Sequence, residues 1–176
     1  MKNFVKWFGV IAFTAVTVFA FAACGDNDTE DGPPQKATQN GLNFTLNTQK
    51  TGYIVSSGVE HTSVIIPSYF SKLPVVAIRD GGFENNDKLT SVTIPATVTS
   101  IGQAAFSRSR SLVSVTCLAV TPPSLEGDFT YHYQQTFGAQ YMNANLRIKV
   151  PSGSVSAYKA HSKWSFYADR IFAITE

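Results

Sequence analysis

The amino-acid sequence predicts a mainly β fold, in which short strands with irregular or short helical connections stack into a solenoid. Three observations predict it. An apolar pattern recurs at an interval of 23 residues. Short Val-x-Ile segments within it alternate apolar and polar residues, as strands with one buried face do. A proline ends three strand-like segments, at Pro67, Pro95 and Pro151, because proline cannot donate to a strand ladder.

The chain begins with a segment typical of protein export. Lys2 and Lys6 precede an uncharged apolar run over residues 7–23, which is the pattern of a secretory signal. The run ends in Phe21-Ala22-Ala23-Cys24, which resembles a bacterial lipobox, although leucine is more usual at the first position. We expect residues 1–23 to be a lipoprotein signal peptide and Cys24 to be the lipidation site of a surface-exposed outer membrane lipoprotein. The alternative is a retained membrane anchor, since the run reaches the lower length limit for spanning a bilayer.

Residues 24–40 are expected to form a flexible acidic tether. Four acidic and no basic residues lie between positions 25 and 34, with glycine and proline, so this stretch cannot bury apolar surface. Acidic residues directly after a lipidated cysteine also resemble a surface-export signal of some Gram-negative lipoproteins, and a plain solvated linker is the alternative. The predicted globular domain covers residues 41–176.

The charge balance argues against a nucleic-acid partner. Without Lys2 and Lys6, the 14 basic residues become 12 and balance the 12 acidic ones. The 12 basic residues of positions 35–176 face eight acidic residues and form no basic run, whereas nucleic-acid-binding domains concentrate basic charge.

The repeats are expected to cover about residues 60–151. The apolar positions Ile78, Phe83, Leu89, Val92 and Ile94 recur as Ile101, Phe106, Leu112, Val115 and Cys117. Val64-x-Ile66 precedes this pair of units, and Leu146-x-Ile148-x-Val150 provides a fourth strand-like match. A unit of this length cannot bury its own apolar face, so neighbouring units must stack. Because Cys117 replaces Ile94 in the pattern, we expect a small buried hydrophobic residue there.

Both ends of the array require caps. Residues 44–46 and 53–55 predict an N-terminal hairpin, with Gly52 near its turn. The C-terminal cap, residues 152–176, is expected to contain a short helix over 154–161. The apolar residues assigned to this cap are Val155, Tyr158, Trp164, Phe166, Ile171 and Ile174.

The segment Ile94–Phe106, read as Ile-Pro-x-x-Val-x-x-Ile-Gly-x-x-Ala-Phe, resembles the BspA-type, or Treponema-type, leucine-rich repeat. The resemblance covers residues 50–175 and implies a short leucine-rich-repeat solenoid used for binding, because members of the family are implicated in adhesion to host proteins and cells. The array differs from longer adhesins in having about three coils. Residues 126–145 are also expected to break the repeat.

No motif indicates catalysis or metal binding. His61, His132 and His161 lack metal-ligand spacing, and neither a Gly-x-Ser-x-Gly elbow nor a phosphate-binding loop is present. We therefore expect no enzymatic activity, no cofactor and no metal.

Two surfaces are candidates for binding. The first is the aromatic insertion, with Tyr131, His132, Tyr133 and Tyr141, whose side chains suit contacts with sugars and proteins. Its alternative role is core packing by Phe129, Phe137 and Tyr141. The second is the outer face of the repeat strands, formed by Ser91, Thr93, Ser114, Thr116, Arg147 and Lys149. Its alternative is an ordinary solvated strand face.

These features predict a lipid-anchored binding or adhesion module that contacts a protein of the host or of a neighbouring cell. One alternative is a glycan-binding accessory lipoprotein that uses the tyrosine-rich insertion. The other is a structural partner within an envelope complex.

Overall fold

The computed structural model describes residues 32–132, 134–138 and 140–175. The predicted signal peptide, Cys24 and the first part of the predicted tether lie outside these residues. The chain from Pro33 onward forms one compact unit. Among the helices of the described residues, none has the length and apolar character needed to cross a membrane.

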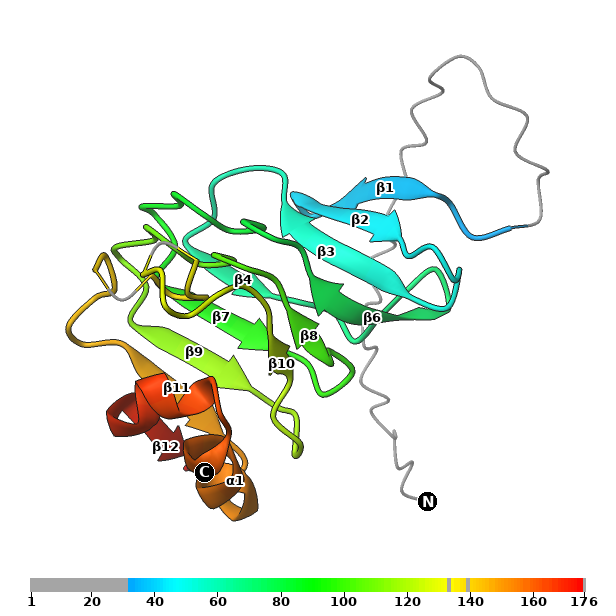
Figure 1. Cartoon of the computed structure of the whole chain (residues 1–176). Coiled ribbons are helices and arrows are strands. Elements are labelled where there is room, and N and C mark those ends of the chain that lie inside the picture. Colours follow the sequence, from blue (N-terminus) through cyan, green and yellow to red (C-terminus); the bar gives the residue numbers. More distant parts are fainter. Residues whose placement is uncertain (1–31, 133, 139, 176) are drawn as a thin grey trace, which may run out of the picture. The chain divides into compact units, whose positions relative to one another are not determined.

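Two ladders of parallel strands run along the array of coils (Figure 1). One ladder contains β4 (Ser63–Ile65), β7 (Ser91–Ile94), β9 (Ser114–Cys117), β11 (Arg147–Val150) and β12 (Ile171–Ala173). The other contains β6 (Leu73–Ile78), β8 (Ser100–Ile101) and β10 (Ser124–Leu125). Successive coils contribute strands to both ladders, as the predicted solenoid requires.

A three-stranded antiparallel meander covers the N-terminal end of the second ladder. The predicted hairpin is confirmed as β2 (Leu42–Leu46) paired with β3 (Tyr53–Ser57), and β3 continues in parallel to β6. A strand of two residues, β5 (Tyr69–Phe70), pairs antiparallel with β6. The prediction of a tether through residue 40 is wrong at its end, because β1 (Lys36–Gln39) pairs with β2. The Tyr53 hydroxyl also fixes this segment by donating to the Pro34 carbonyl at 2.8 Å.

The core contains a stack of phenylalanine rings that runs from coil to coil. Phe83 and Phe106 stack with ring centroids 5.3 Å apart, and Phe106 and Phe137 follow at 5.6 Å. The expectation that residues 126–145 break the repeat is therefore wrong for the core. Phe106 N donates to Thr136 O, just as Phe83 N donates to Ala105 O one coil earlier. The segment is a coil with a longer connection, in which the phenylalanine recurs after 31 residues instead of 23.

The C-terminal cap consists of η1 (Ser152–Ser154), α1 (Val155–Ala160), η2 (Trp164–Arg170) and β12. Tyr158 and Trp164 are fully buried and donate to the carbonyls of Ala119 and Pro123, each at 2.8 Å. The cap is confirmed, and Phe166 lies in it as predicted, on the surface with its side chain 60% exposed. Tyr167, its neighbour in the 3-10 turn, is buried.

Candidate binding surface

The six residues predicted on the outer strand face come together in two rows. Ser91, Ser114 and Arg147 are register partners across β7, β9 and β11, and form the first row. Thr93, Thr116 and Lys149 form the second row in the same way. Every intervening side chain points into the core, as with Val92, Val115 and Ile148, which are at most 1% exposed. The predicted orientation of these strands is therefore confirmed.

The edge strands extend both rows with residues that the sequence analysis did not select. Ser63 of β4 lies opposite Ser91, with hydroxyl oxygens 2.8 Å apart. Ile65 lies opposite Thr93 and is 75% exposed, while Phe172 of β12 lies opposite Lys149 and is 39% exposed. The match of Val64-x-Ile66 to the repeat contained the signal for β4. No repeat signal marked β12.

This outer face, which we call the ladder face, changes in character along the solenoid. Its first strand presents an exposed aliphatic side chain, its next two strands present hydroxyls, and β11 presents two cations. The Arg147 guanidinium lies over the Phe172 ring, 4.8 Å from its centroid. The arrangement offers polar contacts between apolar and cationic ends, and thus suits recognition of an extended surface.

The aromatic insertion separates into core and surface residues. Phe129 and Phe137 are buried, so the core-packing alternative is confirmed for these two. Tyr131 is 52% exposed and His132 is exposed, whereas Tyr133 lies outside the described residues. Tyr141 is half-buried beside the guanidinium groups of Arg108 and Arg110, 5.4 and 5.6 Å from its ring centroid. Tyr131 and Tyr141 thus lie in different surroundings.

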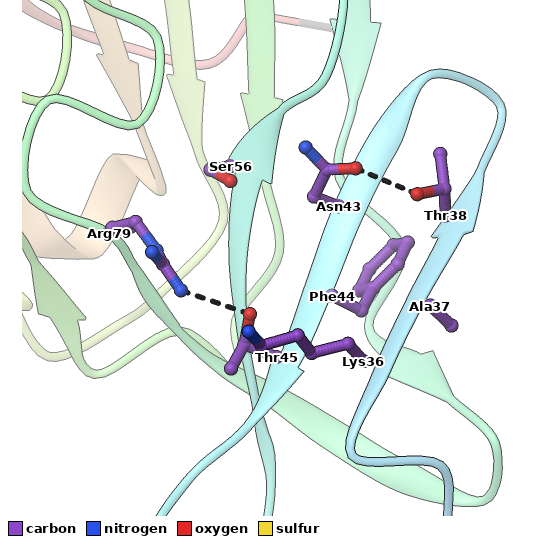
Figure 2. A pocket seen from close by; sticks show the side chains of 8 residues that line it. All are labelled: Lys36, Ala37, Thr38, Asn43, Phe44, Thr45, Ser56 and Arg79. Carbon is purple, nitrogen blue, oxygen red and sulfur yellow. Dashed lines mark hydrogen bonds between the residues drawn. The ribbon is translucent and has the colours of Figure 1, made fainter. Parts of the chain in front are cut away.

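One hollow lies away from the ladder face, and another lies at its edge. One, of about 340 Å³, lies on the N-terminal meander (Figure 2). Its polar groups bond one another, as when Arg79 Nη2 donates to Thr45 Oγ1 at 3.0 Å and Thr38 Oγ1 donates to Asn43 Oδ1 at 2.8 Å. The other, of about 540 Å³, borders the open edge of β4 and includes Ile65 and Tyr69 in its walls. Neither gathers a set of reactive groups.

Cys117 is a packed core residue at the repeat position of Ile94. It is fully buried, and burial raises the pKa of its thiol. The side chain therefore stays in the protonated, unreactive form at neutral pH. The Tyr158 hydroxyl lies 3.2 Å from its sulfur. Within residues 32–132, 134–138 and 140–175, no three His, Cys, Asp or Glu side chains are arranged to hold a metal ion.

Solved structures of three bacterial leucine-rich-repeat proteins resemble this chain, each with a TM-score of 0.46. A Bacteroides capillosus protein is 17% identical, with 66% of this chain and 99% of that one covered. A Treponema pallidum leucine-rich-repeat protein is 18% identical, with coverages of 67% and 72%. A leucine-rich cell surface protein of Faecalibacterium prausnitzii is 18% identical, and this chain covers 43% of its length. No curated protein matches the sequence.

The sequence model of the BspA type leucine-rich repeat region matches residues 46–144 in six copies, where the sequence analysis found about three coils. The match includes most of the segment in which Phe137 continues the ring stack. Repeats of this kind form protein-interaction modules, which agrees with a broad contact face and with a core built for stacking. The matched region exceeds half of the chain, and the protein belongs to the BspA-type leucine-rich-repeat family.

Proposed function

We propose that this protein is a lipid-anchored, surface-displayed binding module that contacts a partner protein through the ladder face. The observation that carries the proposal is the pair of in-register rows on the parallel strands, one across four strands and the other across five, with exposed Ile65 and exposed Phe172 at the ends of the second row. Solenoid faces of this kind provide extended contact surfaces. Apolar anchors separated by short polar side chains match the composition of protein interfaces.

The central threonine offers a direct test of the ladder face. Thr116 lies in the middle strand, so Thr116→Arg places a long cation at the centre of the surface without changing its buried neighbours. We expect the variant to lose binding to extracellular matrix proteins, measured with the purified domain on an immobilised panel. Thr38→Arg is the matched control, because Thr38 is a strand threonine with an exposed side chain, whereas that of Thr116 is partly exposed, and it lies in β1 of the other sheet. Equal binding by both variants would move the contact surface elsewhere.

The proposed anchor and location have separate tests. Metabolic labelling with a fatty-acid analogue is expected to modify the wild-type protein and to leave Cys24→Ser unlabelled. Protease treatment of intact cells is expected to remove the domain while periplasmic control proteins survive. Protection of the domain until the outer membrane is broken would favour the alternative, a structural partner within an envelope complex.

A further inference from the structure

Four arginines from three segments lie around the loop of residues 141–147. Arg108 and Arg110 flank the Tyr141 ring, and Asn143 Nδ2 donates to the Arg110 carbonyl at 2.8 Å. Arg170, at the end of η2, donates through Nη1 to the Ala144 carbonyl at 2.6 Å. Arg147 begins β11 and covers Phe172. We call Arg108, Arg110, Arg147 and Arg170 the arginine cluster.

The positive charge of this cluster is not neutralised by ion pairs. Across the part of the chain that the structure describes, the single ion pair within 4.0 Å joins Lys88 and Glu60, neither of which contacts an arginine of the cluster through an ion pair. One carboxylate is near the cluster without pairing, since Asp169 lines a hollow of about 170 Å³ together with Arg147 and Arg170. The cluster therefore keeps an excess of positive charge.

The side chains are held in place by rings and backbone carbonyls, which do not cancel their charge. A guanidinium group has five N–H donors in a planar fork that matches the oxygens of a sulfate, phosphate or carboxylate group. Arg108 and Arg110 are exposed, so their donors are accessible from solvent. The arginine cluster thus presents guanidinium groups from three segments around one loop, as a candidate site for anionic groups.

We propose that the arginine cluster binds a sulfated polysaccharide. Four cations spread along an open surface, of which Arg147 and Arg170 line a small hollow, suit an extended polymer with repeated anionic groups better than an enclosed small molecule. The partly exposed Phe172 ring and the half-buried Tyr141 ring add apolar surface of the kind that contacts sugars. Four cations form a shorter basic track than duplex DNA requires. The site does not depend on protein binding by the ladder face, although Arg147 belongs to both.

Heparin is a suitable probe, because it is a sulfated polysaccharide with a strong, salt-dependent attraction to arginine. Its dissociation constant is measured with the full-length protein in detergent. We expect Arg108→Asn combined with Arg110→Gln to weaken binding about tenfold, because two charge-assisted contacts are lost. Asparagine is chosen because Arg108 has φ +61°, a conformation that asparagine tolerates. Asp169→Asn is expected to strengthen binding, since it removes the local negative charge.

The matched control is Lys50→Asn combined with Lys72→Asn. It removes the same charge from two exposed cations that also have positive φ, +56° and +68°, in turns of the other sheet. We expect this control to bind heparin within about twofold of the wild type, because distant exposed charges are screened by salt. Equal losses in the two double variants would overturn the proposal in favour of nonspecific attraction.

Competing polymers test the ligand class. Hyaluronan and polyglutamate carry carboxylates without sulfate, and duplex DNA carries phosphates; weak binding of all three is the expected result. Binding of any of them as tight as that of heparin would refute a preference for sulfated polysaccharide. Thermal unfolding of each variant distinguishes loss of the site from loss of the fold, and Arg110→Lys, which keeps the charge without the fork, is expected to recover part of the affinity. Failure of these tests leaves the Thr116→Arg test of the ladder face unaffected.

Discussion

The phenylalanine stack allows a quantitative test of how the coils hold together. Phe106 is 1% exposed, and its ring lies between Phe83 and Phe137 at centroid distances of 5.3 and 5.6 Å. Phe106→Ala removes a ring from a closed site and leaves a cavity, which costs about 3–5 kcal/mol. Because two ring contacts are lost at once, we expect a value near the upper end, about 4–5 kcal/mol. A domain at the lower end of ordinary stability, about 5 kcal/mol, would then be close to unfolding at room temperature.

Urea denaturation followed by circular dichroism measures this cost as a lower midpoint at an unchanged m-value. Phe106→Leu retains most of the apolar volume but removes both stacked contacts, so its cost should be smaller, about 1–2 kcal/mol. Phe166→Ala is the control, because that ring is 60% exposed and its loss should cost less than about 1 kcal/mol. If Phe106→Ala and Phe166→Ala were equally destabilising, the stack would not be the continuous core described above.

Three further predictions concern the backbone, the buried tyrosines and the thiol. Gly102→Ala would place a Cβ 2.3 Å from Asp80 N, so we expect thermal unfolding to show a stability lower by about 3 kcal/mol. Gly153→Ala is the control and should be nearly neutral, because its Cβ would meet no atom within 4 Å. Equal destabilisation by the two variants would contradict the steric argument. Burial raises the pKa of Tyr158 and of Tyr167 above the ordinary value of 10.0. Above that pH the unfolded chain releases protons first, so stability should fall by about 1.4 kcal/mol per pH unit for each tyrosine. Denaturation at several pH values between about 9 and 11 checks this slope, and a flat profile would disprove it. In a Cys24→Ser chain, Cys117 should react with a thiol reagent only after unfolding, since burial raises its pKa; rapid labelling of the native protein would show an accessible thiol.

Much of the solenoid could be predicted from the sequence because stacking imposes the same requirement on each coil. Val92 and Val115 are 23 residues apart and are register partners in the structure. The same offset relates Ile94 to Cys117, so the environment of the cysteine followed from its neighbour. Alternation along each strand then determined which side chains formed the ladder face.

Other parts were hidden because their structure depends on partners rather than on pattern. Lys36–Gln39 has polar, mostly exposed side chains, and becomes a strand only through backbone pairing with β2. Phe137 was separated from its repeat by a longer connection, so the constant offset no longer marked it. The arginine cluster arises from segments that are distant in sequence. The Arg108-Ser109-Arg110 pattern was visible, but the approach of Arg147 and Arg170 required the fold.

The direction of the ladder face has a consequence for any partner. The five strands are parallel and are stacked in chain order. The chemistry of the ladder face therefore changes along the solenoid axis, from Ile65 through hydroxyls to Arg147 and Lys149. A partner segment lying along one strand would meet only two or three outward side chains. A segment crossing the strands would meet the aliphatic, hydroxyl and cationic regions in succession, and its own polarity would then determine its orientation. Such a segment would place an apolar residue at β4 and an anionic residue at β11, where the ladder face adjoins the arginine cluster, because each would meet its complement there.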